Sequence, residues 1–229
     1  MKNFRIIREL STVNFLKATP NELKSVNPRV EIHFTASEPD GHFAKQTHSN
    51  LVIEAGPATQ PDTNMRIEAD GLYTCTAELK LSVQTADCLP VLLWNHGECA
   101  AIHAGWRGLT ANILNKYLEG REAFGYKALL GPCISGQSYE VGTDVVEAFI
   151  EKNKLLTEAD ITTCISKGNY KKWFLDLRIA ATLSLIRLGV EPANIFVTED
   201  CTYLSHNWPS YRRQGKSSQR IISSISIPK

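Results

Sequence analysis

The sequence predicts an α+β fold in which the expected strands outnumber the expected helices and do not alternate with them regularly. Runs with apolar residues at every second position, or apolar throughout, are typical of strands and recur along the chain. Runs with apolar residues three and four positions apart are typical of helices and follow most of the strands. Because 43% of the 229 residues are hydrophobic, the chain can bury a large core, and we expect one domain over residues 1–229.

The expected strands are bounded by residues that favour turns. Leu79, Leu81 and Val83 alternate with polar residues, which predicts a half-buried strand. Other runs are apolar throughout and predict strands buried on both faces. The expected strands cover residues 30–34, 51–53, 79–83, 90–94, 99–102, 127–130, 194–198 and 221–227. Residues 55–66 contain two prolines and a glycine, so we expect a loop there.

The expected helices are marked by apolar residues at helical spacing, which share one face of the first helix. The second of these helices begins near Thr143 or Asp144, and Gly189 ends the third as a C-cap. The expected helices cover residues 109–118, 143–150 and 179–186.

Composition excludes several classes of protein. A net charge of +1 argues against nucleic acid as the main partner, which needs a basic face. The first residues are too charged for a signal peptide, and no run of about 18 apolar residues predicts a membrane helix. We therefore expect a cytoplasmic protein that does not bind a membrane. The six cysteines form no CxxC pair, so we expect free thiols or metal ligands rather than disulfides.

Three residues far apart in the chain have the chemistry of one metal site: His48, Cys88 and His103. Each lies where an expected strand meets a loop, the position at which functional residues are often held. Two imidazoles and one thiolate leave the fourth tetrahedral position of zinc open, which is typical of catalytic zinc. The sequence therefore predicts an enzyme that uses Zn²⁺ as a Lewis acid and water activator.

Other interpretations of these residues stay open. In a cysteine hydrolase, Cys88 is the nucleophile, His103 is its base, and Asp87 or Asp176 orients the histidine. His48 has no obvious role in that arrangement, which favours the metal. A copper-dependent polyphenol oxidase needs more histidines than the six present, which include no HxH pair. A nucleotide- or metal-binding module without turnover is the non-enzyme alternative.

Several segments, among them ADCLP and HAGWRG, resemble the motifs of the YfiH-like family. This family is also called laccase-domain or polyphenol oxidoreductase, purine nucleoside phosphorylase, and peptidoglycan editing factor. The segments are residues 46–48, 69–72, 85–90, 103–108, 131–134 and 210–213.

The resemblance implies an αββα-type sandwich of mixed sheets flanked by helices. It implies zinc, with copper less favoured, on His48, Cys88 and His103. The implied reactions are phosphorolysis of adenosine, inosine and methylthioadenosine, and deamination of adenosine. A peptidoglycan precursor is an alternative substrate. One departure is Ser49, where family members often carry glycine.

Given this chemistry, other residues gain candidate roles. Asp87, beside the expected ligand Cys88, is the first candidate for a proton carrier in catalysis. Arg107 is expected to bind phosphate, because it lies in a glycine-flanked turn before a helix. Arg212 is a second candidate for phosphate. Trp106 and Tyr211 offer flat rings on which a purine can stack.

Overall fold

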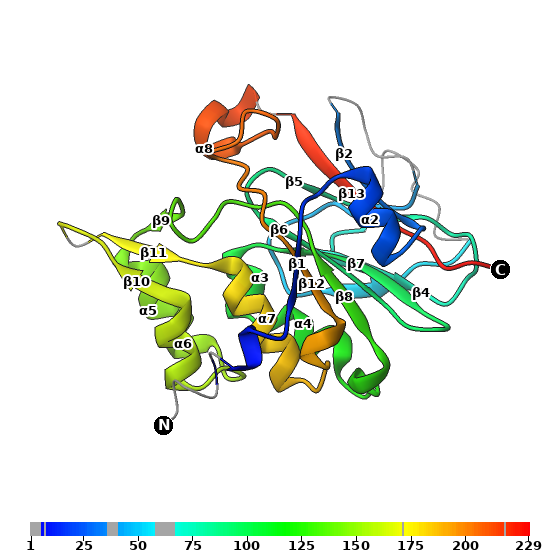
Figure 1. The fold of residues 1–229 in the computed structure, drawn as a ribbon, viewed down its shortest axis with the longest axis horizontal. Helices are drawn as coiled ribbons and strands as arrows, with labels where there is room; N and C mark the ends of the chain where they lie inside the picture. Colours follow the sequence, from blue (N-terminus) through cyan, green and yellow to red (C-terminus); the bar gives the residue numbers. More distant parts are fainter. Residues whose placement is uncertain (1–5, 7, 36–40, 58–66, 171, 218) are drawn as a thin grey trace.

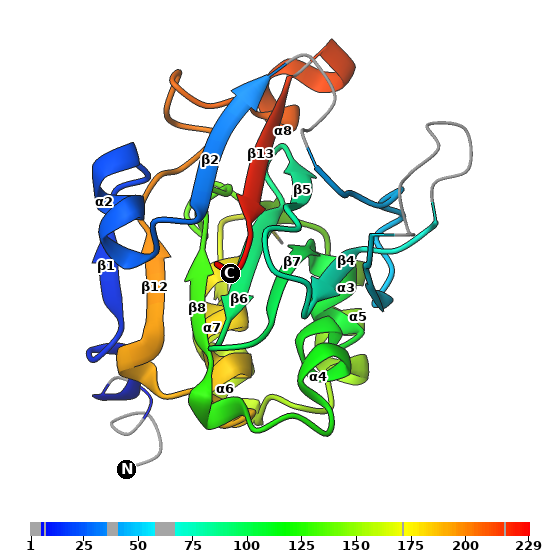
Figure 2. The same cartoon turned by 90° about the vertical axis from the view of Figure 1, so that its right-hand side faces the viewer.

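The fold is built on a seven-stranded mixed sheet (Figures 1 and 2). The computed structural model describes residues 6, 8–35, 41–57, 67–170, 172–217 and 219–229. In spatial order the strands are β1 (Asn14–Leu16), β12 (Ile195–Thr198), β8 (Lys127–Leu130), β6 (Leu89–Trp94), β7 (Cys99–Ala104), β4 (Gly71–Thr74) and β3 (Val52–Glu54). Strands β1, β12 and β8 are parallel, whereas β6 and β7 are antiparallel to their neighbours.

A smaller antiparallel sheet covers one face of the large one. It consists of β2 (Val30–Thr35), β13 (Arg220–Ile225) and β5 (Leu81–Thr85). Between the two sheets lies a core to which β5, β6 and β7 contribute Leu81, Leu92 and Ala101, among other side chains.

Helices cover the opposite face (Figure 1). They are α3 (Trp106–Thr110), α4 (Ile113–Leu118) and α7 (Leu177–Arg187), and α5 (Thr143–Lys152) and α6 (Glu158–Cys164) pack against α3 and α7 in turn. Because side chains alternate along a strand, Val91 and Leu93 of β6 face these helices while Leu92 faces the small sheet. The runs that are apolar throughout are therefore strands buried on both faces, as the sequence predicts.

Shorter elements complete the chain. They are α2 (Pro20–Val26), the small sheet of β9 (Glu140–Val141), β10 (Ile165–Lys167) and β11 (Trp173–Leu175), α8 (Tyr211–Gln214), and the 3₁₀ turns Ala123–Gly125, Pro192–Asn194 and Gly215–Ser217. No helix in the described part of the chain combines the length and apolar character needed to cross a bilayer.

The expected class, mixed sheets flanked by helices, is confirmed. The expected helix over residues 109–118 is wrong in detail, because α3 ends at Thr110 and α4 begins at Ile113. Between them Asn112 adopts the left-handed conformation (φ 57°), which breaks the helical hydrogen-bond ladder. Gly189 follows α7 with φ 101°, which fits the expected C-cap. Most of the expected loop over residues 55–66 lies outside the described residues.

Candidate metal centre

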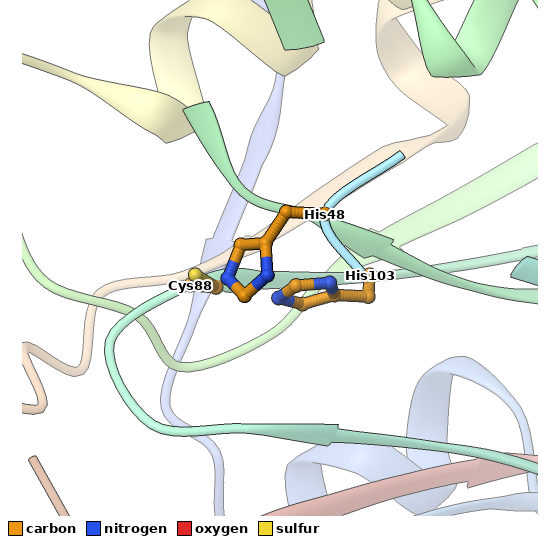
Figure 3. Close-up of side chains that lie close together, drawn as sticks. All are labelled: His48, Cys88 and His103. Atoms are coloured by element: carbon orange, nitrogen blue, oxygen red, sulfur yellow. The ribbon is translucent and has the colours of Figure 1, made fainter. Parts of the chain in front are cut away.

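The structure brings His48, Cys88 and His103 together from three separate segments (Figure 3). Their potential ligand atoms, two imidazole nitrogens and one sulfur, all lie within 4.8 Å of one another. The two imidazole rings meet edge to face with centroids 4.8 Å apart. Cys88 and His103 are neighbours because β6 begins just after the thiol and pairs with β7, so that Leu89 lies opposite Ala104.

His103 is held by a buried carboxylate. Its Nδ1 lies 2.7 Å from Oδ1 of Asp70, which is fully buried. In addition, the backbone N–H of His103 donates to the Asp70 carbonyl at 2.7 Å. With Nδ1 occupied by the carboxylate, Nε2 is the nitrogen of His103 left to bind an ion.

The same carboxylate organises the turn that carries His48. The backbone N–H groups of Thr47, His48 and Ser49 all donate to Asp70, at 3.1, 2.9 and 2.6 Å. The Ser49 hydroxyl adds a fourth bond at 2.7 Å. These bonds hold His48 in the left-handed region (φ 61°), which is uncommon for a residue with a side chain. Ser49, the departure from the family pattern, thus stabilises the turn rather than disturbing it.

Several donors surround the Asp70 carboxylate and change its acidity. Burial alone would raise the pKa of Asp70, but its bonds to His103 and Ser49 lower that pKa well below its ordinary value. Asp70 is therefore a charged group in the interior, stabilised by the turn that it holds.

The Cys88 thiol lies against the two histidines and tends to ionise. Burial alone would raise the pKa of Cys88, but the charge and hydrogen bond of His103, together with those of His48, lower it. For the same reason the Cys88 charge and the Asp70 bond raise the pKa of His103 against the effect of burial. The pair favours a thiolate beside an imidazolium, and thiolate is the form of cysteine that binds metals.

Gly105 forms one wall of the cluster. A Cβ atom at this position would lie 3.1 Å from the Cys88 sulfur, 3.4 Å from Cδ2 of His48 and 3.7 Å from Cε1 of His103. An alanine methyl group at position 105 would therefore crowd the Cys88 sulfur and touch both imidazole rings. Steric crowding therefore explains why the first glycine of the HAGWRG segment, Gly105, has no side chain.

The donor set fits a transition-metal ion. Two nitrogens and one ionised sulfur are the ligands that zinc takes at about 2.0–2.3 Å. Ligand atoms on one such ion must lie somewhat closer together than 4.8 Å, and His48, the exposed member of the three, has the most room to move. Among the described residues, this is the one group of three or more histidine, cysteine or acidic side chains with such spacing.

The cluster opens into a cavity of about 570 Å³, within the range of small-molecule sites. Tyr211, which is 51% exposed, stands at its rim. One wall is fixed by the side chain of Gln46, which donates to the Gln84 carbonyl at 2.7 Å and accepts from its N–H at 2.8 Å. The remaining lining comes from Ala44, Lys45, Thr85, Ala86 and Arg220.

Three of the expected substrate-binding residues do not line this cavity. The guanidinium of Arg107 stacks over the Trp106 ring at 4.5 Å. Arg212 lies over the ring of Tyr139 at 5.4 Å and donates to the Glu140 carbonyl at 3.0 Å. Burial and the Cys88 charge raise the pKa of Tyr139, whereas the charges of Arg212 and Arg107 act in the opposite direction. The Tyr139 ring therefore lies against the Arg212 guanidinium and does not line the cavity.

Asp87 anchors a loop. Its carboxylate accepts from the hydroxyls of Thr202 and Ser210, at 2.6 and 3.0 Å, and from the N–H of Arg212 at 2.6 Å. Asp87 is 8% exposed and adopts φ 83°. These bonds tie the loop before α8 to the Cys88 segment. They support an anchoring role, and a role of Asp87 as proton carrier stays a prediction.

Sequence reasoning missed the roles of Asp70, Gly105 and Tyr139. Asp70 precedes Gly71 in one of the quoted segments, but a residue pair of this kind also occurs in ordinary turns. The sequence offered a clue to Gly105, because it is one of two glycines in the HAGWRG motif. No sequence pattern indicated Tyr139, since its position depends on the loop after β8.

The fold and the site define a class: an α+β protein with mixed sheets whose candidate metal ligands converge at one cavity. Comparison with known proteins agrees with this class. The chain belongs to the family described as "Multi-copper polyphenol oxidoreductase laccase", which matches residues 10–228.

Named relatives extend the comparison. A Bacteroides thetaiotaomicron protein named purine nucleoside phosphorylase is 35% identical over 198 residues, which are 80% of this chain and 72% of that protein. An Escherichia coli K12 protein named purine nucleoside phosphorylase YfiH is 38% identical over 188 residues, covering 80% and 72%. The crystal structure of a Bacillus licheniformis hypothetical protein YfiH has a TM-score of 0.74 at 25% identity, covering 81% and 73%. The chain is thus similar to YfiH-type proteins in both sequence and fold.

Proposed function

We propose that this protein is a zinc-dependent purine nucleoside phosphorylase that acts on adenosine, inosine and methylthioadenosine and also deaminates adenosine. The observation that carries the proposal is the convergence of His48, Cys88 and His103 at a cavity of about 570 Å³. The names of the relatives supply the substrate class.

Each residue of the cluster has a defined part in this proposal. His48, Cys88 and His103 would hold the zinc ion, which when bound would supply a Lewis acid and an activated water. Asp70 keeps Nε2 of His103 directed at the ion. The half-exposed ring of Tyr211 at the cavity rim can stack on the purine.

Arg107 and Arg212 would bind the phosphate that attacks the sugar. Arg107 and Arg212 are both exposed, so a phosphate ion in solution can reach either side chain. Arginine suits this role because its planar fork binds phosphate oxygens in pairs.

A product assay tests the proposal. Zinc-loaded protein is incubated with adenosine, with and without phosphate, and the purines are separated. Phosphorolysis releases adenine only when phosphate is present, whereas deamination gives inosine without it. We expect both products, and we expect both to vanish on chelation and return with zinc. Adenosine that stays unchanged under all these conditions would contradict the proposed function and favour a binding module.

A second candidate function is supported by one observation. Cys88, His103 and Asp70 lie in the order nucleophile, base and orienting carboxylate, which is the arrangement of a cysteine hydrolase. The orienting carboxylate is Asp70, not Asp87 or Asp176 as the sequence suggested, because Asp176 caps α7. A hydrolase acting on a peptidoglycan precursor would work after chelation and would be stopped by alkylation of Cys88. Zinc-dependent turnover would exclude it.

Copper and oxidation of phenols form a third alternative, which the family description raises. Several copper ions need several groups of ligands, and one such group is found in the described part of the chain. Metal analysis of the purified protein decides: we expect about one zinc per chain, and stoichiometric copper would contradict the choice of metal.

A further inference from the structure

Thr85 stands at the end of an apolar row. Leu81 and Val83 of β5 point into the core between the two sheets, whereas Ser82 and Gln84 face the other way. Since side chains alternate along a strand, Thr85 continues the row of Leu81 and Val83. At Thr85 the row leaves the apolar core and reaches the cavity lined by the metal cluster.

The Thr85 hydroxyl has no hydrogen-bond partner among the described residues, although Thr85 is only 2% exposed. A buried hydroxyl without a partner destabilises a folded protein, and valine would fill the same space without that cost. Thr198 and Ser223 also carry unpaired hydroxyls, but neither lines this cavity. Thr85 is thus a lining residue of the cavity with a buried, unpaired hydroxyl, three positions before Cys88.

We propose that the Thr85 hydroxyl binds the 2′-hydroxyl of the ribose and makes the protein select ribonucleosides over 2′-deoxyribonucleosides. This inference rests on the proposed function. In phosphorolysis the reacting carbon is C1′ of the sugar, which must lie beside the cluster. Next to C1′, the 2′-hydroxyl is the group that both donates and accepts, as a threonine hydroxyl does. Because the Thr85 hydroxyl is itself buried, this contact requires a rotation about χ1 of Thr85 that turns the hydroxyl toward the cavity.

The test compares wild type, Thr85→Val and Thr85→Ser on adenosine and 2′-deoxyadenosine. Valine keeps the volume and removes the hydroxyl, whereas serine keeps the hydroxyl. We expect wild type to favour adenosine by at least about tenfold in kcat/KM, because loss of a paired hydroxyl leaves a buried polar group unpaired. Thr85→Val should bring the ratio to about one, with its loss confined to adenosine, and Thr85→Ser should retain the preference. Zinc content should be the same in all three proteins.

The inference would be overturned if the ratio of kcat/KM for adenosine to that for 2′-deoxyadenosine were near one in wild type. It would also be overturned if Thr85→Val left this ratio unchanged. Either result would mean that water alone satisfies the Thr85 hydroxyl. If Thr85→Val does not fold, Thr85→Ala takes its place. Equilibrium binding of the two nucleosides without phosphate provides an independent readout. If wild type releases no base from either nucleoside, the proposed function fails, and equal binding of the two then overturns the inference as well. Tighter binding of adenosine that Thr85→Val abolishes would support the inference even then.

Discussion

Asp70 and His103 are joined by a 2.7 Å hydrogen bond between Oδ1 and Nδ1, although 33 positions separate them in the chain. The carboxylate that orients His103 also accepts three backbone N–H groups of the turn that carries His48. One side chain therefore sets the positions of two of the three proposed ligands.

Replacing Asp70 by asparagine should weaken zinc binding by about 10–100-fold, the usual effect of losing a carboxylate behind a metal-binding histidine. Asparagine keeps the shape, but its NH₂ group would face N–H donors that need an acceptor. Titration against a competing chelator measures the affinity. Asp160→Asn is the matched control, because Asp160 is equally buried but pairs with Arg187 away from the site. Zinc affinity that is the same in both variants would refute the role of Asp70.

Replacing Gly105 by alanine should lower zinc occupancy and phosphorolysis together. The new methyl group would lie 3.1 Å from the Cys88 sulfur, too close for the cluster to keep its arrangement. Metal analysis and the product assay report the loss. Gly97→Ala serves as control, because a Cβ atom there meets nothing within 4 Å. A Gly105→Ala protein with full zinc occupancy would show that the ligands can move aside.

Replacing Arg107 by alanine should lower kcat/KM for phosphate by about 100-fold, a typical effect of removing one charged donor from a transition state. Deamination of adenosine needs no phosphate, so it should change little. Both rates are measured on the same preparation. Arg29→Ala is the control, since Arg29 is exposed and pairs with Glu78. An equal loss in the two reactions would argue for a structural role of Arg107.

Replacing Glu98 by glutamine should change how stability depends on pH. Burial alone would raise the pKa of Glu98, but bonds from Arg121, Tyr126 and Tyr117 lower it. A carboxyl with a lowered pKa in the folded state stabilises the protein above the unfolded value, about 4.3, and this effect fades as pH falls through the folded value. We expect Glu98→Gln to cost about 1–3 kcal/mol at pH 7.

Urea unfolding at several pH values measures this difference. The gap between wild type and Glu98→Gln should close as the pH falls below about 4. A gap that stays constant down to pH 3 would mean that the pKa of Glu98 is the same in the folded and unfolded states.

The sequence was sufficient for features that depend on local pattern. The strands over residues 90–94 and 99–102 follow from runs of apolar side chains, and the structure places both within the sheet. The prediction of one helix over residues 109–118 was wrong at Asn112. The apolar spacing continues through this position, but its left-handed backbone separates one helix from the next.

The candidate site could be predicted only in part. His48, Cys88 and His103 have side chains with a chemistry of their own, so their types and motifs pointed to them. Trp106 and Arg107 lie in the first turn of α3 and Arg212 lies in α8, and none of the three lines the cavity that Tyr211 lines. Where these helices stand relative to the cavity depends on tertiary packing. The role of Asp70 was not predicted, because it arises from hydrogen bonds to segments distant in the sequence.

The proposed ligands differ in their access to solvent: His103 is buried, Cys88 is half-buried and His48 is exposed. An ion would therefore meet two fixed donors on the sheet and a third on an accessible turn. Exchange of the ion would begin at the accessible imidazole of His48, one bond at a time, while the rest of the protein stays folded. Loading of the protein with an ion therefore need not coincide with its folding.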